Sequence, residues 1–168
     1  MGLYHHLQKF WGTPEQKALY KERMIKWRRE EVATKVEHPT RLDRAHALGY
    51  KAKKGFIVVR FRIGKGSSKR EKPAGGRKPT KSGMYAMHPG QNLQSIAEMR
   101  CAKKHPNMQV LGSYYVSEDG RSKWYEIILV DPQSPDIKND QKMKWLLSPA
   151  NKGRVFRGLT AAGKRHRA

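Results

Sequence analysis

The sequence has little of three things: cysteine, acidic side chains and long apolar runs. The single cysteine, Cys101, cannot form a disulfide within the chain, which fits a reducing intracellular compartment. No apolar stretch is long enough to span a bilayer, and the first residues lack a signal-peptide pattern. We therefore expect neither a disulfide-stapled secreted domain nor a membrane protein.

Acidic residues are scarce relative to basic ones. Lysine and arginine total 36 against 14 aspartate and glutamate, which gives the 168-residue chain a formal net charge of +22 and a pI near 10.4. A charge this large repels itself in the compact state and calls for a polyanionic partner. The composition therefore favours a nucleic-acid-binding protein.

The excess positive charge is distributed unevenly along the chain. Residues 1–63 carry a net charge of +9, residues 64–90 of +6 and residues 132–168 of +7, whereas basic and acidic residues balance in 91–131. The neutral segment also has the clearest core pattern, so we expect a near-neutral folded unit with cationic flanks that neutralise phosphates. A solvated surface would interleave both signs more evenly.

The segment from Gly49 to Ile63 combines a core strand with a cluster of cations. Side chains in a strand alternate between its two faces, so Arg60 and Arg62 share one face and the apolar residues at 57, 59, 61 and 63 share the other. Lysines at 51, 53 and 54 precede the strand, between glycines that let the backbone turn. The alternative interpretation is a solvated edge strand with a charged rim.

Capping residues and apolar spacing predict the other elements. The sequence Thr13-Pro14-Glu15-Gln16 is a typical helix start, and we expect that helix to continue to residue 34 or 35. Trp27 lies in its apolar stripe, where an aromatic residue usually belongs to the core, although it could stack on bases. Further helices are expected over residues 3–11, 43–48 and 92–105, and two strands over 108–116 and 123–130, joined by a hairpin loop at Asp119-Gly120.

These elements predict an α+β fold with a small mixed or antiparallel sheet, packed helices and long basic extensions. We divide the chain into a basic N-terminal helical region (1–48), a globular core (49–131) that contains a long basic loop (64–90), and a basic C-terminal extension (132–168). The loop and the extension have few apolar residues. We therefore expect both to be disordered in the isolated protein.

One block of the sequence is long enough to be characteristic of a family. It reads Arg44-Ala-His-Ala-Leu-Gly-Tyr-Lys-Ala-Lys-Lys-Gly55 and leads into Val58-Val-Arg-Phe-Arg-Ile63. This block resembles the signature of the archaeal and eukaryotic large-subunit ribosomal protein family L15e. Further matches are residues 93–98, 110–116 with Glu118-Asp119, 125–132, 157–163, the opening Met-Gly-Leu-Tyr and Trp11. Two features depart from the family: His46 stands where members often have arginine, and members commonly continue past residue 167 into a further basic tail.

The resemblance implies a structural, non-enzymatic protein of the cytoplasmic ribosome. Its partners would be large-subunit rRNA, with the extensions buried among rRNA helices, and neighbouring ribosomal proteins. It implies no membrane, no small-molecule substrate and no cofactor beyond Mg²⁺ or K⁺ held by the rRNA itself. Most contacts would go to phosphates and sugars, which position a protein without reading sequence.

Seventeen residues are predicted to bind RNA. By matching motif position, the resemblance assigns this role to Arg44, Lys51, Lys53, Lys54, Arg60, Arg62, Arg157 and Lys164. Charge and flexibility alone add Lys65, Lys69, Arg70, Lys72, Arg77 and Lys78 in the loop, and Arg165 and Arg167 near the end. Tyr50 is added because an aromatic ring can stack on an unpaired base. We expect loss of the Arg60 and Arg62 cations together to leave the fold intact, to weaken RNA binding and to lower its salt dependence by up to about two units.

Other functions fit the sequence less well. An architectural DNA or chromatin binder shares the electrostatics, and sedimentation with large subunits would separate the two. An RNA-processing enzyme would need clustered acid–base groups, but the histidines are scattered and Asp119-Gly120 is typical of a turn. The histidines at 5, 6 and 46 lack zinc-ligand spacing, and residues 64–69 lack the order of a phosphate-binding loop.

Overall fold

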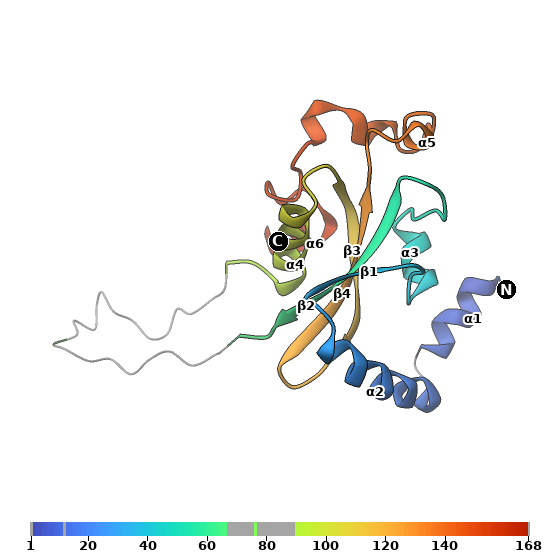
Figure 1. The fold of residues 1–168 in the computed structure, drawn as a ribbon, viewed down its shortest axis with the longest axis vertical. Helices are drawn as coiled ribbons and strands as arrows, with labels where there is room; N and C mark the ends of the chain where they lie inside the picture. Colours follow the sequence, from blue (N-terminus) through green and yellow to red (C-terminus); the bar gives the residue numbers. More distant parts are fainter. Residues whose placement is uncertain (1, 12, 67–75, 77–89, 168) are drawn as a thin grey trace.

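The protein is built around an antiparallel sheet of four strands in the order β1-β2-β4-β3 (Figure 1). The computed structural model describes residues 2–11, 13–66, 76 and 90–167. The strands are β1 (Ala33–Val36), β2 (Phe56–Gly64), β3 (Gln109–Glu118) and β4 (Ser122–Val130). Strand β4 is interior and buried from residue 124 to 130, as its apolar pattern on both faces predicts. The predicted α+β class is confirmed.

Helices cover both faces of the sheet, so that it lies in the middle of three layers (Figure 1). On one side lie α1 (Leu3–Phe10), α2 (Pro14–Arg29) and α3 (Leu42–Ala47), and on the other α4 (Leu93–Lys104) and α6 (Ala161–Arg167). The short helices α5 (Pro135–Lys138), η1 (Lys144–Leu147) and η2 (Pro149–Asn151) follow β4 at one end of the sheet.

Two helices begin at the predicted caps. The backbone N–H of Gln16 donates to Thr13 Oγ1 over 3.4 Å, and that of Ser95 donates to Asn92 Oδ1 over 2.7 Å. Each bond satisfies one of the backbone donors that the first turn of a helix leaves open. The sequence signals for where α2 and α4 start are therefore confirmed.

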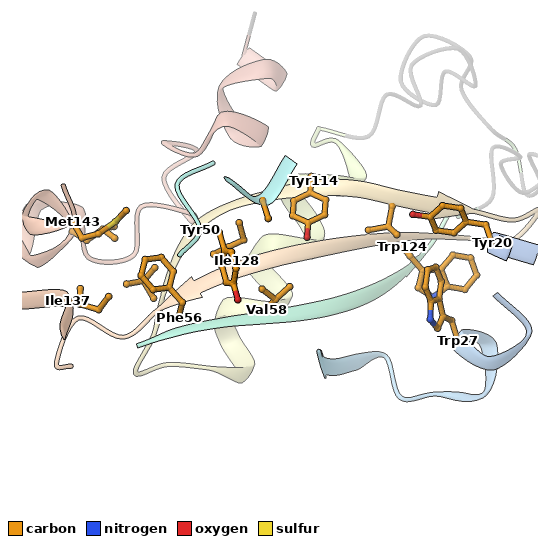
Figure 2. Close-up of a cluster of buried hydrophobic side chains, with 14 residues drawn as sticks. Tyr20, Trp27, Tyr50, Phe56, Val58, Tyr114, Trp124, Ile128, Ile137 and Met143 are labelled. Carbon is orange, nitrogen blue, oxygen red and sulfur yellow. The ribbon is translucent and has the colours of Figure 1, made fainter. Parts of the chain in front are cut away.

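An aromatic cluster fills the space between the sheet and helices α2 and α3 (Figure 2). Its rings form a chain: the Tyr20 centroid lies 5.8 Å from that of Trp11 and 5.9 Å from that of Trp27, which lies 6.2 Å from Trp124. Such pairs add about 0.5–1.5 kcal/mol each beyond the area they bury. Trp27 is therefore a core residue that fixes α2 to the sheet.

An aliphatic cluster lies on the opposite face, under α4. Val59, Ile127 and Leu129 face Ala97 and Cys101 of that helix, and none is more than 1% exposed. Burial raises the pKa of the Cys101 thiol to about 12, so this side chain stays neutral. It acts as the small buried hydrophobe that its helical spacing predicts.

The prediction for the end of α2 is wrong. The helix ends at Arg29, and Ala33–Val36 form β1, which pairs with Val58–Phe61 of β2. Without β1, the backbone groups along that edge of β2 would lack partners, so pairing outweighs the helical continuation.

The expected disorder of the C-terminal extension is also wrong for residues 132–167. Ile137, Met143 and Leu146 belong to the aromatic cluster, and Val155 belongs to the aliphatic cluster. The apolar residues of this segment are few, but these four are each 5% exposed or less, so their placement outweighs their number. The expected disorder of the loop concerns residues that mostly lie outside those described.

No helix in the described ranges is long and apolar enough to cross a membrane. In the same ranges, no three histidine, cysteine, aspartate or glutamate side chains are grouped so that they could hold a metal ion.

Candidate nucleic-acid interface

Three of the predicted RNA-binding cations are exposed and carry no ion pair or hydrogen bond from their side chains within the described part of the chain. They are Arg44 on α3, Lys54 in the loop before β2, and Lys164 on α6. Such side chains can meet a phosphate without first breaking an internal contact. They are the cations most available to a polyanion.

Two more predicted cations share one carboxylate. Asp140 Oδ2 lies 2.6 Å from Lys51 Nζ and 2.9 Å from Lys53 Nζ, and these two lysines hold the pKa of Asp140 well below its ordinary value. The side chains of both lysines remain at least 30% exposed. A phosphate approaching this loop would therefore compete with Asp140.

Glycines shape the loop that carries these lysines. Gly49 and Gly55 have φ angles of +91° and +90°, which other residues rarely adopt. At Gly55 a Cβ atom would also lie 2.6 Å from Ile137 Cγ1. The turn predicted between the two glycines is thus required by both conformation and packing.

Arg60 and Arg62 share one face of β2, as predicted, but both are engaged by α2 and the residue after it. Arg60 Nη2 lies 2.6 Å from Glu30 Oε2, its guanidinium lies 4.5 Å from the centre of the Trp27 ring, and its side chain is only 11% exposed. Arg62 Nη1 donates to the carbonyl oxygen of Arg28 over 2.6 Å. Arg60 therefore stabilises the packing of α2, and Arg62 is the more open of the two.

The remaining predicted residues have mixed environments. Lys65 pairs with Glu118 at 3.3 Å, Arg165 Nη2 donates to Gln94 Oε1 over 2.9 Å, and Arg157 Nη2 donates to the carbonyl oxygen of Lys152 over 3.0 Å. The loop residues Lys69, Arg70, Lys72, Arg77 and Lys78 lie outside the described residues, as does the side chain of Arg167.

Tyr50 lies in the core. It is 7% exposed, and its ring packs edge-on against His46 at 6.0 Å and Phe56 at 5.9 Å (Figure 2). A ring in this position cannot stack on a base without leaving the aromatic cluster. The ring instead packs the turn after α3 against the sheet.

Two buried carboxylates that the sequence patterns did not single out hold the layers together. Glu126 of β4 accepts hydrogen bonds from the Tyr114 hydroxyl (2.6 Å), the Thr40 backbone N–H (2.9 Å) and the Thr40 hydroxyl. Glu98 of α4 accepts from the hydroxyls of Thr160 (2.6 Å) and Ser113. A carboxylate within an apolar strand or helix face was the available signal, because buried charges need partners.

Glu98 holds the C-terminal segment against α4 through its hydrogen bond with Thr160. Burial raises its pKa above the ordinary value, against the opposing effect of its two hydroxyl donors. Arg154 lies nearby and donates to the backbone carbonyls of Leu159 and Val110, and burial lowers the pKa of its guanidinium. This arginine has a structural role, although in the sequence it counts toward the basic extension.

The chain is similar to known proteins over nearly its whole length. A family model described as "Ribosomal L15" matches residues 2–168. The large ribosomal subunit protein eL15 of Metallosphaera sedula is 50% identical over 165 residues, which cover 98% of this chain and 76% of that protein.

Proposed function

This chain belongs to the ribosomal protein L15e family, and from that premise we propose that it is a structural constituent of the large ribosomal subunit that binds rRNA. The observation that carries the proposal is the net charge of +22 on a folded α+β core. Neutralising phosphates releases their condensed counterions, which favours binding to any folded RNA. The chain would thus hold RNA segments in place and carry out no chemistry itself.

The cations contribute to different degrees. Arg44, Lys54 and Lys164 are exposed and unpaired within the described residues, so they are the first candidates for phosphate contacts. Lys51 and Lys53 would exchange Asp140 for phosphate. Arg60 contributes mainly through the fold, because its guanidinium is covered by Trp27 and paired with Glu30.

The other predicted RNA contacts lie partly within and partly outside the described residues. Lys65, Arg62, Arg157 and Arg165 lie on described elements, and the loop residues Lys69, Arg70, Lys72, Arg77 and Lys78, together with Arg167, are proposed on charge alone. Exposed apolar residues such as Leu3, Leu19 and Phe156 suit contacts with neighbouring ribosomal proteins.

Salt-dependent binding tests the proposal. We expect the whole chain to bind large-subunit rRNA with an affinity that falls steeply as salt rises, with a slope of about 0.7–0.9 for each phosphate neutralised. The control is a DNA duplex of equal phosphate number, which an architectural DNA binder would bind at least as well. Absence of the chain from purified large subunits, together with no preference for rRNA over DNA, would contradict the proposal.

A further inference from the structure

A polar hollow of about 450 Å³ opens at the outer edge of strand β3. It is lined by Arg41 and Arg44 beside α3 and by Gln94 of α4 and Arg165 of α6, helices that cover opposite faces of the sheet (Figure 1). Strand β3 is last in the strand order, so no other strand of the described residues pairs with its outer edge. The hollow therefore brings guanidinium groups from both faces of the sheet to one strand edge.

Two of the three arginines around the hollow are held by neighbouring side chains, and the third is free to meet a ligand. Arg165 is held by Gln94, whose Nε2 donates to the Ser113 carbonyl over 2.9 Å and to the Ser113 hydroxyl over 2.8 Å. Arg44 is exposed and has no partner among the described residues. The one acidic group in the lining, Asp43, is paired with Arg41 at 3.1 Å. The lining therefore keeps two positive charges in excess, and an anion is the favoured occupant.

Hydrogen-bonding groups are left unsatisfied at this place. Five buried side-chain atoms in the described residues have no hydrogen-bond partner, and two of them, Arg41 Nε and Asp43 Oδ1, belong to the lining. Buried polar atoms usually have a partner, so such a concentration points to an absent one. A ligand that both donates and accepts hydrogen bonds meets both requirements.

We propose that this hollow binds one unpaired nucleotide of RNA, with the phosphate on Arg44 and Arg165 and the base in the hollow beside Tyr115. The proposal rests on the proposed function and names the RNA feature that this surface takes. The volume lies within the usual range of about 300–1,000 Å³ for ligand sites. Tyr115 also lines the hollow and is 42% exposed, and unpaired bases commonly stack on such rings. A base-paired duplex keeps its bases stacked, so only its phosphates could reach the rim of the hollow.

The test compares two RNA hairpins of equal length, one fully paired and one with a single bulged nucleotide. We expect the whole chain to prefer the bulged hairpin by at least about fivefold, as the stacking of one base allows. The variant R44Q/R165Q should lose this preference. The matched control R29Q/R100Q removes two exposed arginines outside the hollow and should keep the preference while weakening binding to both hairpins.

A second variant tests the contact with the base separately from the contact with the phosphate. Tyr115→Leu should reduce the preference for the bulged hairpin and leave the salt dependence unchanged, because no cation is lost. Equal preference in R44Q/R165Q and R29Q/R100Q, or equal binding of both hairpins by the unmodified chain, would overturn the nucleotide site while leaving rRNA binding intact. Binding of an acidic peptide that only R44Q/R165Q abolishes, without a bulge preference, would assign the hollow to a protein partner instead. A chain that binds neither hairpin nor rRNA would refute the proposed function as well.

Discussion

The two faces of the sheet are packed in different ways. The aliphatic cluster joins β2 and β4 to α4, which directly precedes β3 in the chain, and apart from Phe61 and Tyr125 its buried side chains are small or branched. The aromatic cluster collects residues from 20 and 27 near the N-terminus to 143 and 146 near the C-terminus (Figure 2). Helix α2 therefore packs on the aromatic face alone, whereas the C-terminal segment folds back onto both faces, with Val155 on the aliphatic one.

This difference shows how a chain of charge +22 keeps a core. The basic ends contribute few residues to the core, but those include large rings and residues buried completely, such as Trp27 and Leu146. Their charged neighbours remain on the outer surface of the helices, where Lys26 and Arg29 are exposed. The same segments thus supply the core on one side and cations on the other.

The largest expected effect comes from removing the ring that joins the sheet to α2. Trp124 is 1% exposed and faces Trp27. Trp124→Ala should lower the free energy of unfolding by about 3–5 kcal/mol, because the ring leaves a cavity where α2 packs on the sheet. Urea unfolding measures the change, and amide hydrogen exchange should accelerate in α2 more than in α4.

Trp145 provides the matched control. It is 41% exposed and contacts Arg154, whose guanidinium lies 4.7 Å from the ring centre. Trp145→Ala should cost about 1 kcal/mol or less. Equal losses from the two substitutions would show that the aromatic cluster does not hold the N-terminal helices.

The sequence predicts the aliphatic face better than the aromatic face for a physical reason. Helix α4 and the hairpin of β3 and β4 are specified by local signals, namely the Asn92 cap, helical spacing and the Asp119-Gly120 turn. By contrast, β1 is stabilised by its pairing with the edge of β2, which is distant in the sequence. The order of residues 132–167 follows from contacts with a distant cluster, which local periodicity does not encode.

The sequence predicted which cations could form the candidate interface, but not which of them are paired with carboxylates. The sequence identifies Arg44, Lys54 and Lys164 as candidate RNA-binding cations, and all three are exposed in the structure. Sequence alone did not indicate that Glu30 engages Arg60 or that Asp140 engages Lys51, because those partners lie 30 and 89 residues away. The hollow beside β3 depends on helices from both faces of the sheet meeting at one strand, which only the fold reveals.

An intermediate effect is expected from the carboxylate that anchors the C-terminal segment on the aliphatic face. Burial raises the pKa of Glu98 above its ordinary value, so the folded protein retains this proton at pH values where the unfolded chain has lost it. The free energy of unfolding should therefore fall as pH rises from the ordinary pKa of glutamate through the raised pKa of the folded state. The fall is about 1.4 kcal/mol for every pH unit that separates these two pKa values. Glu98→Gln should remove this dependence, as measured by urea unfolding across that range.

Thr160→Val distinguishes the effect of the Glu98 proton on stability from that of the hydrogen bond between Thr160 and Glu98. It removes the donor 2.6 Å from Glu98 Oε2 but keeps the carboxyl group. We expect a loss of about 1–3 kcal/mol and a pH dependence that persists. If Glu98→Gln and the unmodified chain had the same pH dependence, the proton at this site would not be linked to folding.

The smallest expected effect concerns Asp140, on the segment that folds back over the aromatic cluster. Its carboxylate binds Lys51 and Lys53, and its strongly lowered pKa means that mild acidification does not break these pairs. Asp140→Asn should free Lys51 and leave Lys53 held only by the Asp136 carbonyl oxygen, 2.8 Å from its Nζ. We expect it to raise the affinity for rRNA by up to about fivefold, since ion pairs of partly exposed lysines are weak. Fluorescence anisotropy at low salt measures the change.

Asp136→Asn distinguishes release of the lysines from a simple change in net charge. Asp136 is exposed, it precedes Asp140 by four residues, and its side chain forms no ion pair within the described residues, so both substitutions raise the net charge equally. A larger gain from Asp140→Asn would mean that this carboxylate occupies the place of an RNA phosphate in the free protein. A loss of affinity would mean the reverse: Asp140 orients the two lysines for RNA, and the C-terminal segment contributes to the interface by holding cations supplied by the opposite end of the chain.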